Sequence, residues 1–128
     1  MTYKKPYEHV SNLSEAIWLS NDTPVGESDF TLVFNDRYPC VEGHKLFIPK
    51  ENNSHFIGKS YSMAYDHGNE LVTKGTISGF NIGMNIGVCA GQTIMWPHIH
   101  FIPRHKNDAK KIGGIRHAHP GADHTKYY

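Results

Sequence analysis

Two histidines in the second half of the chain stand one residue apart, at a spacing that can support catalysis. The stretch from Gly91 to Arg104 has the sequence GQTIMWPHIHFIPR, which places His98 and His100 on either side of Ile99. A β-strand points residues i and i+2 to the same face, so both imidazoles are expected to face one way. At neutral pH an imidazole serves as base, acid or nucleophile. Such a pair suits attack on phosphorus, in which one ring attacks and the other donates a proton to a phosphate oxygen or to the leaving group.

Groups that could hold phosphoryl oxygens lie close by in the sequence. Gly91, Gln92 and Thr93 stand a few residues upstream, and Asn85 belongs to the preceding predicted strand. Backbone N–H groups, a hydroxyl and a carboxamide are donors that stabilise charge on a reacting phosphate. These four residues are therefore candidates for the substrate-binding part of a site.

The spacing by itself leaves two other interpretations open. A His-x-His pair on a strand is a short motif that often has no function. It is also a spacing found in metal sites, because neutral imidazoles bind zinc, copper or iron. A zinc site built on cysteines is not expected, because Cys40 and Cys89 lie far apart and no Cys-x-x-Cys pair exists. We expect both cysteines to be buried free thiols.

The composition excludes several classes of protein. The 128 residues are most simply one domain, and a hydrophobic content of 38% suffices for one core. A net charge of +1 lacks the basic excess of a nucleic-acid-binding surface. No apolar run approaches membrane-spanning length, and the N-terminal sequence MTYKKPYEHV lacks the apolar core of a signal peptide. We therefore expect a soluble, cytoplasmic protein that binds neither nucleic acid nor membranes.

Hydrophobic periodicity predicts the elements that must position the histidines. Apolar residues at roughly helical spacing between Ser54 and Lys74 predict a long helix, with Asn53 or Ser54 as its N-cap. Runs rich in β-formers predict strands over residues 14–20, 30–34, 44–49, 80–87 and 94–102, the last bent near Pro97. This order predicts an α+β fold, an antiparallel sheet of about five strands with one long helix packed on it.

The same pattern predicts how the chain is organised. We expect one domain over residues 1–128, with a core from about 30 to 120 and peripheral terminal segments. The last part is polar and rich in glycine and histidine, which predicts an irregular, solvated tail. Its histidines are His105, His117, His119 and His124.

Several blocks of the sequence, in order, resemble the signature of the histidine-triad (HIT) family of nucleotide hydrolases and transferases. That signature is His-φ-His-φ-His-φ-φ, with φ hydrophobic, preceded by Gly-Gln-Ser/Thr-Val/Ile. Here residues 91–94 resemble the lead, and residues 98–104 resemble the part of the signature from the second histidine onward. The blocks at residues 36–50, 85–87, 106–108 and 113–116 resemble further family blocks. The resemblance implies the HIT fold over about residues 30 to 120.

The resemblance also implies a role for each matching residue. His98 would be the nucleophile that takes up a nucleotidyl group as a covalent phosphoramidate. His100 would bind the phosphate and assist the leaving group, while His44 would lie beside the pair and set its hydrogen bonding. Asp36 would contact the ribose hydroxyls. The α-phosphate site would be lined by Asn85, Gly91, Gln92 and Thr93.

The implied activity is cleavage of a phosphoanhydride or phosphoramidate bond on a nucleoside monophosphate, with adenine as the default base. Dinucleoside polyphosphates and adenosine phosphoramidate are the implied substrate types. No metal or cofactor is needed, and a homodimer whose sheets join across the interface is implied. Two alternatives remain, a nucleotide-binding module with little or no catalysis and a metalloprotein that uses His44, His98 and His100 as ligands.

The chain departs from the family signature at the first histidine, where Trp96 stands, followed by Pro97. A nucleophilic imidazole needs its other nitrogen held by an acceptor. By resemblance, the backbone carbonyl at this position supplies that acceptor, and Trp96 retains it. The related galactose-1-phosphate uridylyltransferases carry His-Pro-His here, so Pro97 is compatible with a nucleophile after it. We expect the Trp96 indole to pack under the sheet rather than to stack on a base.

Overall fold

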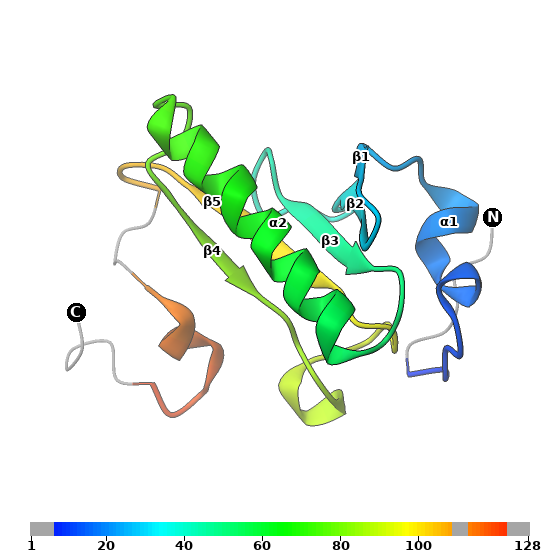
Figure 1. Ribbon diagram of the computed structural model, residues 1–128. Helices are drawn as coiled ribbons and strands as arrows, with labels where there is room; N and C mark the ends of the chain where they lie inside the picture. Colours follow the sequence, from blue (N-terminus) through cyan, green and yellow to red (C-terminus); the bar gives the residue numbers. More distant parts are fainter. Residues whose placement is uncertain (1–6, 109–112, 123–128) are drawn as a thin grey trace.

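The computed structural model describes residues 7–108 and 113–122. A sheet has the strand order β1-β2-β3-β5-β4, and every neighbouring pair is antiparallel. Its strands are β1 (Gly26–Glu27), β2 (Thr31–Asn35), β3 (Lys45–Pro49), β4 (Gly79–Gly83) and β5 (Ile99–Arg104). Helix α2 (Ser54–Thr73) connects β3 to β4 and lies along one face of the sheet (Figure 1). The predicted α+β fold, with five strands and one long helix, is confirmed.

Helix α2 forms where the sequence predicts it, and Asn53 is its N-cap. The Asn53 side chain accepts a hydrogen bond from the backbone N–H of Phe56 at 2.9 Å. The apolar side of the helix packs on the sheet in a core that includes Val33, Phe47, Ala64, Ile99 and Phe101. Within the described ranges, the helices are all too short or too polar to cross a membrane.

Gly68 lies where α2 packs against the Phe80 and Phe101 rings of the sheet. A Cβ at this position would stand 2.6 Å from the Phe80 ring and 2.7 Å from the Phe101 ring, so the close approach requires glycine. Gly68→Ala is expected to lower the free energy of unfolding by about 1–3 kcal/mol through overpacking. The control is Gly58→Ala on the same helix, where a Cβ has nothing within 4 Å and where alanine should stabilise by up to about 1 kcal/mol. Urea denaturation measures both, and effects of the same sign would contradict the argument.

The N-terminal segment covers part of the opposite face of the sheet, and the strand predicted over residues 14–20 is wrong. A 3-10 turn (Leu13–Glu15) leads into the short helix α1 (Ile17–Asn21). The Asn21 side chain donates to the carbonyl of Ile17 at 2.7 Å. Packing explains the helix, because its Ile17 and Trp18 join a second core over the sheet. The other members of this core are Val10, Leu13, Ala16, Leu32, Phe34, Leu46, Ile48 and Trp96. The fifth strand of the sheet is therefore β1, and not the segment over residues 14–20.

Two strands are shorter than predicted, and both differences affect the site. Strand β4 ends at Gly83, so Asn85 lies in the loop beyond it. Strand β5 begins only at Ile99, because Pro97 has no N–H to donate to a neighbouring strand. The residues before Pro97 contact the N-terminal segment instead, where the Tyr7 N–H donates to the Thr93 carbonyl at 2.8 Å.

The loops hold both cysteines, and their exposure differs from the expectation. Cys40 and Cys89 are free and exposed rather than buried. Cys40 lies in the β2–β3 connection and Cys89 in a 3-10 turn (Val88–Ala90), where no core element covers them. In the tail, His105 and His119 are exposed as expected, while His117 is half-buried and His124 lies outside the described residues.

Candidate active site

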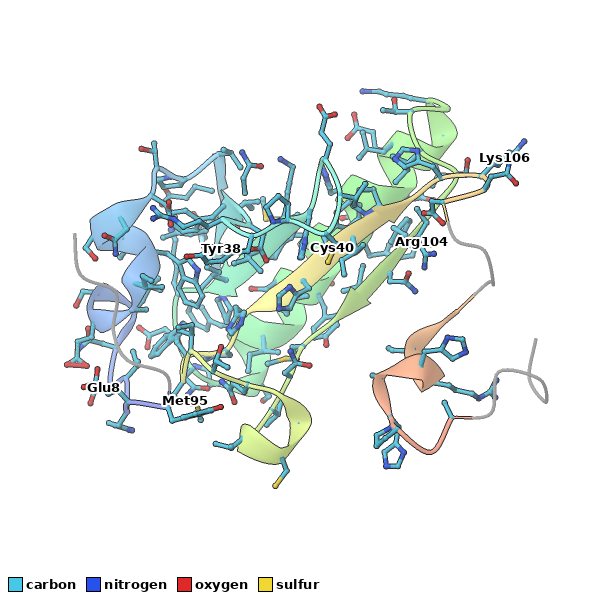
Figure 2. The ribbon with its side chains drawn as sticks, turned by 180° about the vertical axis from the view of Figure 1, so that it is seen from behind. Glu8, Tyr38, Cys40, Met95, Arg104 and Lys106 are labelled. Atoms are coloured by element: carbon cyan, nitrogen blue, oxygen red, sulfur yellow. The ribbon has the colours of Figure 1, made fainter. Side chains whose placement is uncertain are left out.

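The candidate site lies on the face of the sheet opposite α2, where His100 of β5 stands opposite Leu46 of β3. Figure 2 shows this face, with α1 on one side of it and the C-terminal 3-10 turn (Ile115–Ala118) on the other. Alternation along β5 directs Ile99 and Phe101 into the core under the helix and His100 to the other face, opposite Leu46 of β3. Asp36 follows β2 directly, and His44 precedes β3. These two are joined by a backbone hydrogen bond from the Asp36 N–H to the His44 carbonyl at 3.0 Å. The antiparallel pairing of β2, β3 and β5 thus brings together residues far apart in the sequence.

His98 is buried, and its ring is held in one tautomer. Its Nδ1 lies 2.8 Å from the backbone carbonyl oxygen of Trp96. A carbonyl only accepts, so Nδ1 carries the hydrogen and Nε2 keeps a free lone pair. The Trp18 indole packs against the ring, with 5.0 Å between centroids. The acceptor expected from the carbonyl at position 96 is therefore present.

The Trp96 side chain packs in the core, as predicted. It is 3% exposed and belongs to the core on the site's face of the sheet. Its Nε1–H donates to the carbonyl of Pro49, the last residue of β3, at 3.0 Å. The indole therefore fixes the segment whose backbone carbonyl holds His98.

His44, His100 and Asp36 form a second hydrogen-bonded group. The backbone N–H of Cys40 donates to His44 Nδ1 at 3.0 Å, so the hydrogen of a neutral His44 ring is on Nε2. That Nε2 lies 2.9 Å from His100 Nδ1 and 3.2 Å from Asp36 Oδ2. Asp36 Oδ1 accepts from the backbone N–H of Tyr38 at 2.8 Å. His44 thus donates to His100 Nδ1, which leaves the hydrogen of a neutral His100 on its Nε2.

Among the described residues, this same group offers ligand atoms close enough to share a metal ion. The atoms of Asp36, His44 and His100 all lie within 4.8 Å of one another. A tetrahedral zinc with bonds of about 2.0–2.1 Å would hold its ligand atoms about 3.3 Å apart. The His44–His100 separation of 2.9 Å is that of a direct hydrogen bond. The group is therefore satisfied internally, and it does not include His98, which the metalloprotein alternative needs.

A cavity of about 320 Å³ opens against His98 and His100, within the range of small-molecule sites. Its other lining residues are Ile17, Trp18, Asp22, Asp36, Arg37, Tyr38, Leu46, Asn85, Gly91, Thr93 and Ile94. Gln92 is not among them, because its side chain braces the loop, accepting from the Gly87 N–H at 2.8 Å and donating to the Ile94 carbonyl at 3.0 Å. A larger hollow of about 460 Å³ beside Arg104 includes neither histidine.

Seven lining residues of this cavity were not predicted as site residues from the sequence, and three of them, Trp18, Asp22 and Arg37, make contacts that shape the site. Trp18 packs in the core and also contacts the His98 ring. Arg37 donates to Asp22 at 2.8 Å and to the Asn21 carbonyl at 3.1 Å, which ties the end of α1 to the segment after β2. The position of Arg37 directly after the predicted site residue Asp36 could have marked Arg37 as a site residue. No sequence feature marked Asp22.

Burial lowers the pKa of all three site histidines. For His98, burial is the main cause, opposed by the hydrogen bond to Trp96 and by the charge of Asp36. For His44, burial again outweighs Asp36. For His100, burial and then the neighbouring His98 and His44 lower the pKa to about 4, against the opposing charge of Asp36. All three rings are therefore neutral at pH 7 in the protein without substrate, and a neutral His98 is able to attack.

These shifts make the fold sensitive to acid. The pKa of His100 is about 4 in the folded chain, against 6.5 as its ordinary value. Because the folded value is lower, the unfolded chain binds more protons below pH 6.5, so stability present above that pH is lost as the pH falls toward 4. The part due to His100 is at most about 3 kcal/mol. Thermal unfolding followed by circular dichroism from pH 8 to 4 should show this loss. His100→Asn should reduce it, and a variant profile parallel to the original would contradict the assignment.

Comparison with known proteins identifies the family. Residues 20–107 match the family model of the HIT domain, which is more than half of the chain. The chain belongs to the HIT family. This is a family of nucleotide-binding hydrolases and transferases, and the position of the histidines of this HIT protein in a cavity agrees with such a function.

Individual relatives of the HIT protein support the same assignment. A HIT-like protein of Borreliella burgdorferi is 35% identical over 98 residues, covering 66% of this chain and 67% of the relative. An adenylylsulfatase of Arabidopsis thaliana is 34% identical over 89 residues, covering 64% of this chain but only 45% of the relative. The crystal structure of a zinc-bound histidine triad family protein from Mycobacterium smegmatis matches with a TM-score of 0.63 at 26% identity, covering 70% of this chain and 73% of that one.

Proposed function

We propose that this HIT protein hydrolyses or transfers a nucleotidyl group through a covalent intermediate on His98. The observation that carries the proposal is the 2.8 Å hydrogen bond between His98 Nδ1 and the Trp96 carbonyl. It leaves the Nε2 lone pair free on a ring that lines the cavity beside His100. An imidazole in this state is a nucleophile prepared for attack on phosphorus.

The reaction has two steps. Nε2 of His98 attacks the α-phosphorus, and an N–P bond forms while the bond to the leaving group breaks. The leaving group takes a proton from the His44–His100 pair, which is protonated when the anionic substrate is bound, and the positive charge on the phosphorylated His98 ring is stabilised by the Trp96 carbonyl. Water or another acceptor then attacks the phosphorus and gives up a proton to His100, and the N–P bond breaks to release the nucleoside monophosphate from His98.

The cavity supports a nucleotide as substrate. Its apolar side, which includes Trp18 and Leu46, suits a nucleobase, and its polar side presents Asn85, Gly91 and Thr93 to phosphoryl oxygens. The bond cleaved is a phosphoanhydride or phosphoramidate of a nucleoside monophosphate, with adenosine phosphoramidate and dinucleoside polyphosphates as candidate substrates. The adenylylsulfatase among the relatives adds adenosine 5′-phosphosulfate to these candidates.

The test is to incubate the protein with these three kinds of substrate, without added metal, and to follow AMP by chromatography. We expect AMP release and, at short times, intact protein whose mass has increased by one nucleotidyl group. AMP binding in a thermal-shift assay without release from any substrate would instead favour a nucleotide-binding module. Activity that chelators abolish and zinc restores would favour the metalloprotein.

The family resemblance also leads us to propose a homodimer. Strand β4 is one of the two outer strands of the sheet, and among the described residues one of its edges pairs with no other strand. Pairing of two β4 strands would join the two sheets. Light scattering in solution tests this, and a monomeric mass at all concentrations would contradict it.

A further inference from the structure

We infer that Asp36 is a positioning residue, which enables the His44–His100 pair to hold the proton that the leaving group receives. The inference rests on the proposed function and goes beyond the ribose contact that the family resemblance implies for Asp36. Its basis is the position of one carboxylate oxygen against both rings.

The geometry directs the Asp36 carboxylate toward the histidines. Oδ2 lies 3.2 Å from His44 Nε2 and 3.6 Å from His100 Nδ1, while Oδ1 is held by the Tyr38 N–H at 2.8 Å. The Asp36 side chain is only 13% exposed, and that of His44 is 4% exposed. A carboxylate this enclosed, with one oxygen fixed by the backbone, has a set orientation toward the pair.

Counting hydrogens shows why the pair needs this oxygen. When both rings are neutral, His44 Nε2–H donates to His100 Nδ1, and the arrangement is complete. When the pair takes up a further proton together with the anionic phosphate of a substrate, His100 also carries a hydrogen on Nδ1, and two N–H groups then face each other. His44 cannot turn its hydrogen elsewhere, because its Nδ1 accepts from the Cys40 N–H. Asp36 Oδ2 lies at hydrogen-bond distance from His44 Nε2 and at ion-pair distance from His100 Nδ1, so it can accept from one N–H group and neutralise the charge of the other ring.

The other charged and titratable groups do not replace Asp36 in this role. Among the described residues lining the cavity, His98 is a third ring that opposes protonation of His100, and Asp22 is ion-paired with Arg37 at 2.8 Å. Burial and the neighbouring rings lower the pKa of His100, and Asp36 acts in the opposite direction. Without this carboxylate the protonated pair would keep two facing donors and lose its counter-charge.

The proton balance then fits the first step of the reaction. The protonated pair, neutralised by Asp36, gives one proton from His100 Nε2 to the departing group as the bond to phosphorus breaks. The pair is left neutral, and it regains a proton from the water that attacks the intermediate. A leaving group that departs as a stable anion needs no such proton.

The test compares two leaving groups in Asp36→Asn, which keeps the shape of the side chain and removes its charge. Ammonia leaves adenosine 5′-phosphoramidate only with a proton, whereas sulfate leaves adenosine 5′-phosphosulfate without one. We expect kcat/KM for the phosphoramidate to fall by about 100-fold or more, as for loss of general acid catalysis. For the phosphosulfate we expect a fall of less than about 5-fold. The ratio of the two kcat/KM values is the readout, because it cancels changes in binding of the shared adenylyl group.

The controls separate this role from the alternatives. Asp22→Asn removes another carboxylate of the same cavity and should leave the ratio unchanged, whatever it does to binding. A ribose contact made by Asp36 would lower kcat/KM for both substrates by the same factor, so an unchanged ratio in Asp36→Asn overturns the inference.

A second measurement does not depend on turnover. Titration of the imidazole rings by nuclear magnetic resonance should show that His44 and His100 take up a proton at lower pH in Asp36→Asn than in the original protein. Unchanged titration of both rings would overturn the inference even if the enzyme were inactive on every substrate. Absence of AMP release from the original protein would overturn the proposed function alone.

Discussion

Replacing His98 by alanine is expected to abolish release of AMP from every nucleotide substrate, by at least about 10⁴-fold in kcat. The reason is chemical, since the variant has no nitrogen to form the N–P bond. Chromatography of the products measures the rate, and intact-protein mass should show no nucleotidyl adduct. Nucleotide binding should persist, because the cavity retains its other lining residues.

A second variant tests whether the loss of activity in His98→Ala comes from damage to the structure. His98 is buried, and its loss leaves the Trp96 carbonyl without a donor. His98→Asn retains a side-chain N–H that can donate to this carbonyl, yet it has no nucleophilic nitrogen, so it should be as inactive as alanine. His105→Ala serves as the matched control, because His105 is exposed just beyond β5 and outside the cavity. Full turnover in either His98 variant would show that the covalent mechanism is wrong.

Local signals were enough to predict the elements that support the site. The helical spacing of apolar residues and the Asn53 cap predict α2. Both signals depend only on residues that are close together in the sequence. The strand predicted over 14–20 failed because α1 is stabilised by burial of Ile17 and Trp18 against distant strands. A short apolar run fits a strand or a helix equally well, and only its packing partner decides between them.

The site was predictable to the extent that its parts are close in sequence. The spacing of His98 and His100 marked the pair, while His44 entered only through the family resemblance. Pairing of β3 with β5 brings His44 within 2.9 Å of His100, and nothing in the residues near either one specifies that pairing. The ion pair between Asp22 and Arg37 depends in the same way on where α1 packs. Gln92 shows the opposite case, because hydrogen bonds within its own loop turn its amide away from the cavity.

Trp96→Ala is expected to damage both the fold and the reaction. Loss of a fully buried tryptophan costs about 3–5 kcal/mol of unfolding free energy, and here the hydrogen bond to Pro49 is lost as well. The backbone carbonyl that holds His98 then has no fixed position. A displacement of about 1 Å at a reacting group can cost about 100-fold in rate, so kcat should fall by that order even at temperatures where the variant stays folded. Urea denaturation gives the stability, and AMP release gives the rate.

Two further substitutions separate the indole from the carbonyl. Trp96→Phe keeps most of the packing and loses only the N–H to Pro49, so it should cost about 1–3 kcal/mol of stability and change kcat less than about 3-fold. Equal loss of rate in the phenylalanine and alanine variants would mean that the indole itself takes part in the reaction. Trp96→His introduces the residue that the family signature has at this position. If the carbonyl alone holds the nucleophile, this change should not raise the rate. A gain of about 10-fold or more would instead identify the original chain as a nucleotide-binding module that Trp96 has made inactive.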